Sequence, residues 1–488
     1  MLPPLIRREL LKPSPRQRAE FRGSGRCKRE GERGVTMALV AVSMVAIISM
    51  AALSIDLGTL YEAKTEAQRA ADAGALAAAR VISVSGITGD PTNGGTDGSW
   101  APICGGGTSA ATLAATNVAQ QNLIGGAVAS TVNVYYGTSG GVATDMDCAI
   151  AGTGFGVNPV VQVYVQQKTL PTFFARVFSL LPGGTSSNSG VSATATAQAF
   201  NSSNSAAFAS EMMPVQPRCV KPWIVPNSDP GNGGAYFVVP ATGNINHQGV
   251  YESNGGVIGE TFNLSADCIP GATDCLPAAG HAYNNPPQWN SANQPGILQY
   301  VPALVQGVSS AIPSCSTANP FPQAIAGCDQ STVYACGTPN GATINFNENP
   351  MSPAIFTGDT NTAVACLTQA SPTYSGADTL APATFPFQIQ AGLGNPLVQA
   401  GVVKDNGVIS TSNSIVTVPI YDSSPVALVG VQPPVTILGF LQVFINQLNP
   451  NGSMSVTVMN VSGCSNNAAG NPTVSGTSPV PIRLITQP

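Results

Sequence analysis

Charged and titratable side chains are scarce in this sequence of 488 residues. Asp, Glu, Lys and Arg together make up only 9% of it, and there are two histidines, His247 and His281. Nucleophilic and acid–base catalysis need several titratable groups that converge on one point. Neither an HExxH motif nor a CxxC pair occurs, so the usual zinc-binding spacings are missing. The sequence therefore predicts a protein that is not an enzyme, with no catalytic residues, no metal and no cofactor.

Basic residues are also few beyond the N-terminal region. Residues 81–488 contain six Lys and Arg against sixteen Asp and Glu, an acidic balance that argues against nucleic acid as a partner. Ten of the nineteen basic residues lie instead between Arg7 and Arg33. This distribution predicts a basic tail of residues 1–34 on one side of a membrane and an acidic region on the other.

A long apolar run follows the basic tail directly. No charged residue occurs from Val35 to Ile55, and as a helix these 21 residues would span roughly 31 Å, close to the thickness of a bilayer core. We expect a transmembrane helix at 35–55, with the basic N-terminus in the cytoplasm and the C-terminal region outside it. A cleaved signal peptide is the alternative. The helical pattern continues through the end of the run, which favours an uncleaved anchor.

Small residues continue the helical pattern at three- and four-residue spacing over residues 56–82. Glu62 lies on the opposite, charged face, and Arg69 is the expected partner of Asp72. Asp56, at the end of the apolar run, is either an interfacial residue that ends the span or a contact to lipid headgroups or a neighbouring subunit's helix. The small face predicts close packing on a sheet or another helix; it comprises Ala63, Ala67, Ala71, Gly74 and Ala78.

The next region, residues 83–205, reads as an α+β unit. Residues 86–109 are rich in Gly, Thr, Asp and Ser and predict a loop, and helices are expected at 110–123 and, with Pro near its first turn, at 171–178. Alternating or clustered β-branched and aromatic residues predict strands at 131–136, 160–166 and 191–200.

The amino-acid composition changes in residues 206–488, which contain many Pro, Gly and Asn residues. This region is predicted to form a β-rich domain. Residues 435–447 are the most hydrophobic stretch here, too short for a second span, and are interpreted as a buried strand and turn or as a core helix. The clear strands are expected at 235–239, 414–420, 426–431 and 454–461.

Ten of the eleven cysteines follow the apolar run, whereas Cys27 precedes it. An even number in an oxidising compartment predicts disulfides. Short loops favour Cys268 with Cys275 and Cys315 with Cys328, although sequence alone does not fix connectivity. The candidate disulfide cysteines are Cys104, Cys148, Cys219, Cys268, Cys275, Cys315, Cys328, Cys336, Cys366 and Cys464.

Two loops carry acidic residues that invite a functional interpretation. Glu252 and Glu260 flank a Gly-rich turn and could form a carboxylate pair, although exposed loop carboxylates explain them equally well. The segment 229–233, Asp-Pro-Gly-Asn-Gly, is rich in oxygen ligands but lacks the alternating ligands of an EF-hand, so a simple turn is favoured over a calcium loop.

The segment 33–80 resembles the N-terminal module of the TadE/TadG-like (Tad-type) pilus-assembly family. The resemblance rests on an Arg-Gly pair, an apolar span, Asp-x-Gly and a Gln-led Ala-rich run, in that order. In this chain the motif residues are Arg33, Gly34, Asp56, Gly58, Gln68 and Asp72. The resemblance extends more weakly to about residue 200 and is only loose beyond it.

The resemblance implies a bacterial inner-membrane component of Flp pilus assembly, with other pilus-assembly proteins as partners. Two departures limit what is carried over. Prepilin-like members have Glu at the fifth position beyond the cleaved Gly, where this chain has Leu39, which argues against prepilin processing. The metal site of a von Willebrand-type domain begins Asp-x-Ser-x-Ser, a pattern that residues 422–425, Asp-Ser-Ser-Pro, break.

Two hypotheses about function follow. The first is a non-enzymatic, inner-membrane-anchored component of Tad/Flp-type pilus assembly with a large periplasmic region. The second is a membrane-anchored surface-binding or adhesin-like protein that uses a Tad-type anchor. The expected fold class is α+β: a single transmembrane helix that continues into a long Ala-rich helix packed on a small sheet, followed by a β-rich, disulfide-containing domain.

Overall fold

The computed structural model of the chain describes about two thirds of its residues and divides the chain into two compact units. One unit comprises residues 1–58 and 173–185, and the other 59–172 and 186–488. The described ranges are 32–96, 98–138, 143–151, 154–170, 190–203, 215–266, 296–305, 320–336, 342–345, 361–370, 376–382, 384–424, 432–449, 453–464 and 474–485.

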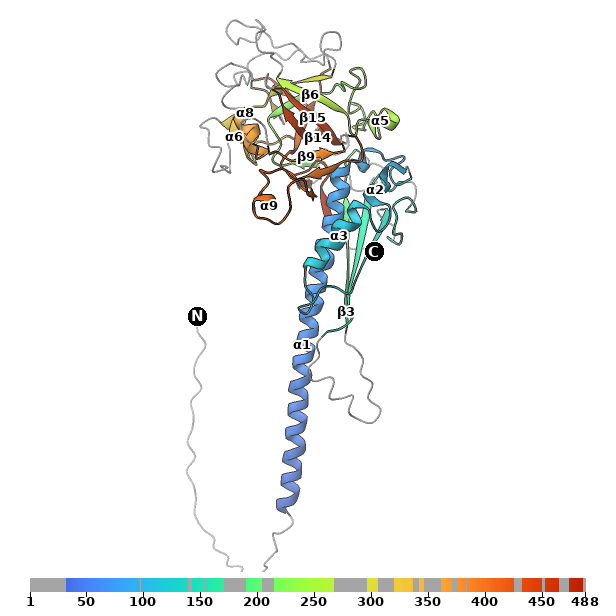
Figure 1. The fold of residues 1–488 in the computed structure, drawn as a ribbon, viewed down its shortest axis with the longest axis vertical. Helices are drawn as coiled ribbons and strands as arrows, with labels where there is room; N and C mark the ends of the chain where they lie inside the picture. The colour runs from blue at the N-terminus through green and yellow to red at the C-terminus, as the bar shows by residue number, and fades with distance from the viewer. Residues whose placement is uncertain are drawn as a thin grey trace, which may run out of the picture. The chain divides into compact units, whose positions relative to one another are not determined.

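The first element is one uninterrupted helix, α1 (Glu32–Ser85), as the sequence predicted (Figure 1). It contains no proline, and its Ala-rich second half favours the helical state. The helix ends at Gly86, which adopts a left-handed φ of 88°. A Cβ at this position would lie 2.6 Å from both the Ile258 Cγ2 atom and the Met459 carbonyl oxygen, so only glycine fits.

A four-stranded antiparallel sheet packs on the second half of α1. Its order is β1-β2-β3-β17, so its fourth strand comes from the far end of the chain. The predicted strands near 131, 160 and 191 and the helix at 110–123 are confirmed. The elements are α3 (Ala110–Gln121), β1 (Thr131–Thr138), β2 (Pro159–Gln167), β3 (Val191–Ala199) and β17 (Ile482–Ile485).

Small side chains let α1 approach this sheet and α3 closely. Ala67, Ala71 and Ala78 are fully buried, while Glu62 on the opposite face is exposed. A Cβ added to Gly74 would lie 3.1 Å from the Ala115 carbonyl oxygen and 3.3 Å from Val163 Cγ1. The predicted small face is therefore a packed interface within the chain.

A closed six-stranded barrel forms the main β-rich body. Its order is β12-β14-β15-β6-β7-β5, with parallel pairing between β6 and β7 and between β12 and β5. The buried-strand interpretation of residues 435–447 is confirmed, because nearly all of them lie in β14. The barrel strands are β5 (Trp223–Pro226), β6 (Thr261–Ala266), β7 (Ile297–Pro302), β12 (Ile415–Tyr421), β14 (Ile437–Leu448) and β15 (Met454–Gly463).

Shorter elements connect these bodies. The predicted loop at 86–109 contains two 3-10 turns and one short helix. The additional elements are η1 (Ile87–Gly89), η2 (Gly98–Trp100), α2 (Ala101–Cys104), β4 (Val215–Pro217), α5 (Tyr251–Asn254), α6 (Pro320–Ala326), β8 (Ala342–Thr343), α8 (Asn361–Leu367), β9 (Thr379–Ala381), β10 (Gln388–Gln390), α9 (Pro396–Gln399), β11 (Val408–Ile409), β13 (Pro434–Val435) and β16 (Val474–Gly476).

The predicted strand at 235–239 is wrong. This segment makes only isolated bridges, from Ala235 to Asp229 and from Val238 to Ile245. Both backbone groups of Val238 bond to the side chain of Asn227, whose Oδ1 accepts from the Val238 N–H at 3.0 Å and whose Nδ2 donates to its carbonyl at 2.7 Å. An amide side chain thus takes the hydrogen bonds that a neighbouring strand would have made.

Three disulfides that have both cysteines in the described ranges link segments distant in sequence. They are Cys104–Cys148, Cys219–Cys328 and Cys336–Cys464, with sequence separations of 44, 109 and 128. Cys366 is also disulfide-bonded. The predicted Cys315–Cys328 pair is wrong, because Cys328 pairs with Cys219; short loop length was a poor guide where β-strands bring distant residues together.

Several predictions fall outside the described residues. These are the Cys268–Cys275 pair, the helix at 171–178 and the strand at 426–431. The proposed boundary near residue 205 also stays a prediction. The pairing of β17 with β3 shows, however, that a strand from the C-terminal region belongs to the N-terminal sheet.

Candidate functional site

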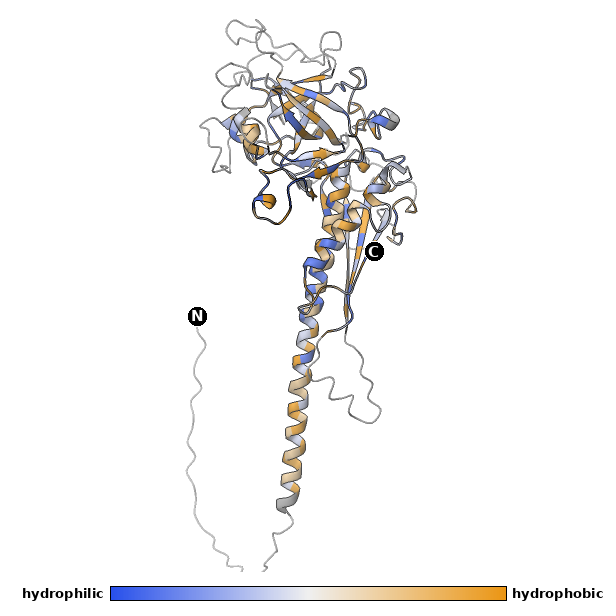
Figure 2. Ribbon diagram, viewed as in Figure 1, coloured by the Kyte–Doolittle hydropathy of each residue, from blue (hydrophilic) through white to orange (hydrophobic). Residues whose placement is uncertain are grey.

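The first half of α1 exposes an unbroken set of large apolar side chains. Met37 is 79% exposed, Val35 66% and Ile47 62%, and no residue of its most apolar stretch is buried. The apolar residues lie on all sides of the helix rather than along one stripe (Figure 2). Water would solvate such a surface unfavourably, whereas the hydrocarbon of a bilayer matches both its length and its polarity. This half of the helix has the properties of a membrane anchor.

Two motif residues lie where the apolar run ends. Asp56 is only 3% exposed and takes part in a polar interaction. Gly58 has open space on its Cβ side, with no atom within 4 Å of a Cβ built there. Nothing in the described chain therefore requires glycine at position 58. The side chains of the other two early motif residues, Arg33 and Gly34, lie outside the described part.

The remaining motif residues, Gln68 and Asp72, join α1 to strand β3. The Gln68 side-chain amide donates to Asp72 Oδ1 at 2.8 Å and to the Thr194 carbonyl at 3.2 Å. One turn earlier, Lys64 Nζ donates to the Ser192 carbonyl. The expected Arg69–Asp72 pair is wrong: within the described chain Arg69 is exposed and no ion pair joins it to Asp72.

These contacts cover an open strand edge. β17 pairs with β3 only from Thr196 to Ala199, so the first half of β3 has no strand partner on that side among the described residues. Unpaired strand edges attract other strands, and proteins often protect them with lysine or other polar side chains. Lys64 and Gln68 provide that protection here, which gives the Gln-led motif a structural role.

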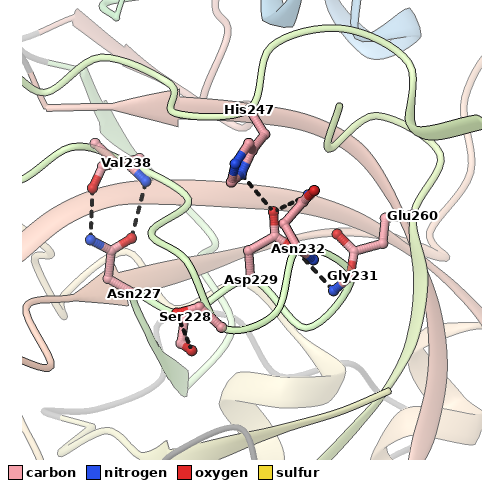
Figure 3. Close-up of polar contacts among 9 residues, drawn as sticks. Asn227, Ser228, Asp229, Gly231, Asn232, Val238, His247 and Glu260 are labelled. Atoms are coloured by element: carbon pink, nitrogen blue, oxygen red, sulfur yellow. Dashed lines mark hydrogen bonds and ion pairs between the residues drawn. The ribbon is translucent and has the colours of Figure 1, made fainter. Parts of the chain in front are cut away.

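A buried acidic cluster lies among the loops near the barrel (Figure 3). It consists of Asp229 and Glu260, which are 0% and 2% exposed, with His247 Nδ1 3.6 Å from Asp229 Oδ2. The proposed Glu252–Glu260 pair does not form: Glu252 is exposed, and Glu260 lies beside Asp229. The interpretation of Glu260 as an exposed loop carboxylate is therefore also wrong.

The turn at residues 229–233 is held by the Asp229 carboxylate. Its Oδ1 accepts from the backbone N–H of Gly231 at 3.1 Å and of Asn232 at 3.2 Å, and its Oδ2 accepts from Asn232 Nδ2 at 2.8 Å. Glu260 Oε1 accepts from the same Gly231 N–H at 2.6 Å. This is the Asx-type turn that the sequence favoured over a calcium loop. Across the described ranges, no group of three or more His, Cys, Asp or Glu residues could hold a metal ion.

Burial and proximity change the protonation of the cluster. Burial and, secondarily, the nearby Asp229 charge raise the pKa of Glu260 to about 9. Glu260 is therefore protonated at neutral pH and can donate a hydrogen bond to Asp229. Sequence spacing does not indicate this pair, because its members are 31 residues apart and belong to different loops. The hydrogen bonds of the two carboxyl groups fix the turn.

Comparison with known families identifies the anchor region. Residues 34–81 match the Tad family, described as "Putative Flp pilus-assembly TadE/G-like". No curated protein and no solved structure matches the chain. The matched segment contains both the exposed apolar half of α1 and the residues that bind β3. This match and the apolar helix together indicate a membrane-anchored component of pilus assembly.

Proposed function

We propose that this protein is a non-enzymatic component of Tad/Flp-type pilus assembly, anchored in a bacterial inner membrane by residues 35–55. The residues after the anchor lie on the periplasmic side. The observation that carries the proposal is the fully exposed apolar half of α1, which lies inside the segment that matches the Tad family.

The charge distribution supports this orientation. Ten basic residues precede the apolar run, and residues 81–488 are strongly acidic. The positive-inside rule then retains the N-terminus in the cytoplasm. The disulfides of the barrel region are consistent with an oxidising compartment on the other side.

Gly58 supports a role in assembly with other membrane proteins. Glycine is less favourable in a helix than alanine by roughly 1 kcal/mol, and open space surrounds this one. A glycine that costs helix stability, and whose Cβ position no described residue of the chain approaches, suits the close approach of a second helix. We assign this contact to a partner helix of the pilus-assembly machinery.

The arrangement of the acidic cluster supports the proposal that the protein is not an enzyme. Of the titratable groups in the described loops, Asp229 and Glu260 have the environment closest to that of a catalytic pair. Both Asp229 oxygens and Glu260 Oε1, however, accept hydrogen bonds from the turn that they stabilise. This arrangement supports a structural role for both carboxyl groups.

A reporter fused after Pro488 tests the topology. A periplasm-dependent reporter should be active in the full-length fusion and a cytoplasm-dependent one inactive. Cytoplasmic activity would overturn the orientation. A membrane-released fragment that begins near Asp56 would show that the apolar run is a cleaved signal.

Substitution of Gly58 tests the assembly role. Gly58→Leu should leave folding and membrane insertion unchanged but reduce pilus formation and co-purification with pilus proteins. Gly107→Leu is the matched control, because a Cβ there also meets no atom within 4 Å. Normal piliation in the Gly58→Leu strain would argue against a helix contact at this position.

A second candidate function is an anchored surface-binding protein. It is favoured by one specific observation, an uncharged polar face on the four-stranded sheet.

A further inference from the structure

The face of the sheet that points away from Gly74 and α3 carries uncharged hydrogen-bonding side chains along most of three strands, with the buried Val160 at the start of β2 as an apolar member. Along β2, Val161, Val163 and Val165 are buried, so the alternating residues point to the other face. We call this the polar face. It comprises Thr131, Asn133 and Tyr135 of β1, Gln162, Tyr164 and Gln166 of β2, and Ser192, Thr194 and Thr196 of β3.

The strand register places these side chains in rows. Asn133, Tyr164 and Thr194 are direct neighbours across the three strands, and so are Tyr135, Gln162 and Thr196. Each row thus combines an amide, a tyrosine ring and a hydroxyl group. Eight of the nine side chains are exposed or half-buried, and only Thr196 is buried.

A pocket of about 550 Å³ opens at the edge of the polar face. Gln162, Thr194 and Thr196 of the polar face form one wall, and the motif residues Gln68 and Asp72 of α1 form another. The volume lies within the range of small-molecule sites. Tyr164 lies beside the pocket, because it is the cross-strand neighbour of Thr194.

The pocket offers one carboxylate, several neutral polar groups and the apolar residues Ala195, Leu484 and Ile485. Asp72 Oδ1 accepts from Gln68, and within the described chain its second oxygen accepts no hydrogen bond. No Lys or Arg is among the described residues that line the pocket. Lys64 bonds the Ser192 carbonyl, the Arg483 guanidinium bonds Gln198 Oε1 at 3.2 Å, and the exposed Lys168 follows the end of β2, outside the pocket lining. An anionic ligand in the pocket would therefore meet the Asp72 carboxylate without a cation in the pocket wall.

A saccharide has the complementary chemistry. Its hydroxyl groups both donate and accept, which matches a carboxylate, side-chain amides and threonine hydroxyls. The C–H face of a pyranose ring is apolar and stacks on an aromatic ring such as that of tyrosine. We propose that the pocket and the polar face bind a neutral saccharide chain, with Asp72 and Thr194 bonded to ring hydroxyls and Tyr164 stacked on a sugar ring.

An added β-strand from a second copy of this chain is the competing occupant. The open edge of β3 is where such a strand would pair. Lys64 and Gln68 already bond the carbonyls of Ser192 and Thr194 along that edge. A strand would have to displace both side chains, whereas a saccharide in the pocket leaves these bonds in place.

The test uses the full-length protein in nanodiscs and isothermal titration calorimetry. The probes are chitohexaose and cellohexaose as neutral chains and hexagalacturonate as an anionic one. We expect at least one neutral hexasaccharide to bind about tenfold or more tightly than hexagalacturonate. Preference for chitohexaose would indicate that the natural ligand is a polysaccharide of N-acetylated amino sugars. Preference for cellohexaose would indicate a polymer of simple hexoses. Failure of both neutral chains to bind would overturn the proposal.

Variants locate the binding. Tyr164→Ala should weaken the affinity for the neutral hexasaccharide by about tenfold or more. Asp72→Asn, which keeps the shape of the side chain, should weaken this affinity by several-fold. Tyr236→Ala is the matched control, because this tyrosine is 42% exposed and lies outside the polar face. The control variant should bind the hexasaccharide with unchanged affinity. Equal affinity in all three variants would refute the site. Tyr164-dependent self-association without saccharide binding would assign the face to a second copy instead. Pilus formation is measured in a separate experiment, so failure of the proposed assembly function would not decide whether the pocket binds a saccharide.

Discussion

Asn460 Nδ2 donates a hydrogen bond to the backbone carbonyl of Ser83 at 2.6 Å, which ties barrel strand β15 to the last turn of α1. The same amide lies 3.3 Å from Thr88 Oγ1, and Asn460 is fully buried. The carbonyls of the last helical turn have no partner within the helix, so an outside donor is needed when they are buried. The second half of the anchor helix and the barrel are therefore joined by specific polar bonds.

Removal of this amide should destabilise the domain. Asn460→Ala leaves the Ser83 carbonyl buried without its donor, at a cost of about 1–3 kcal/mol in the free energy of unfolding. Urea unfolding of the protein measures this cost. Gln120→Ala, on the exposed side of α3, should change the unfolding free energy by less than about 0.5 kcal/mol. Equal stability of the two variants would show that Asn460 is dispensable.

The small face of α1 should not tolerate a large residue. Ala71 is fully buried, and leucine there would overpack the contact with the sheet at a cost of about 1–3 kcal/mol. Ala71→Leu should therefore impair folding or pilus assembly, as seen by thermal unfolding and pilus counts. Glu62→Ala, on the exposed face, should change little. If both variants behave like the wild type, the face does not pack as described.

Stability should depend on pH through Glu260. Its pKa of about 9 in the folded state lies above the ordinary value of 4.5, so the folded state binds more protons between these values. This contribution is fully present below about pH 4.5 and is lost as pH rises through about 9. Glu260→Gln should remove the decline, which is measured as the difference in unfolding free energy between variant and wild type across this window.

The comparison with the variant is necessary because Lys221 acts in the opposite direction. Burial lowers the pKa of Lys221 to about 7 from 10.5, so its contribution makes stability rise with pH between those values. Lys221 is present in both proteins, and its effect cancels in the difference. An unchanged pH dependence in Glu260→Gln would show that Glu260 is not protonated in the fold.

The Cys336–Cys464 disulfide should contribute substantially to stability. Its sequence separation is 128 residues, and the chain-entropy estimate for so long a loop is about 4–5 kcal/mol. The double substitution Cys336→Ser/Cys464→Ser should lower the unfolding free energy accordingly, measured by urea unfolding without reductant. Cys27→Ser is the control and should have no effect. Thiol labelling of the native wild-type protein should modify Cys27 and few others.

The sequence predicted best what local periodicity determines. The long helix, its small face from Ala63 to Ala78 and strands β1, β2 and β3 follow from spacing within one segment. The run at 435–447 was ambiguous, because periodicity alone does not distinguish a buried strand from a buried helix when a short stretch is apolar throughout. Its pairing with β12 and β15 decides the matter, and these partners are not local.

Contacts between distant segments could not be predicted. The Cys219–Cys328 bond and the Asp229–Glu260 pair depend on which loops the barrel brings together. The failed strand at 235–239 has a similar cause, since a side chain from another segment, Asn227, takes the backbone bonds. The Tad-type motif drew attention to Gln68 and Asp72, but it did not indicate the hydrogen bond from Gln68 to β3.

The pairing of β17 with β3 sets an order of events during biosynthesis. Arg483 of β17 bonds Gln198 of β3 across 285 positions of sequence. The ribosome makes β3 long before β17, so the small sheet stays one strand short until nearly the whole chain has emerged. During that interval the incomplete edge is a target for chaperones and for misassembly. Loss of β17, for example through a premature stop codon near residue 480, should therefore destabilise the sheet that packs on α1, although this sheet is otherwise encoded near the start of the gene.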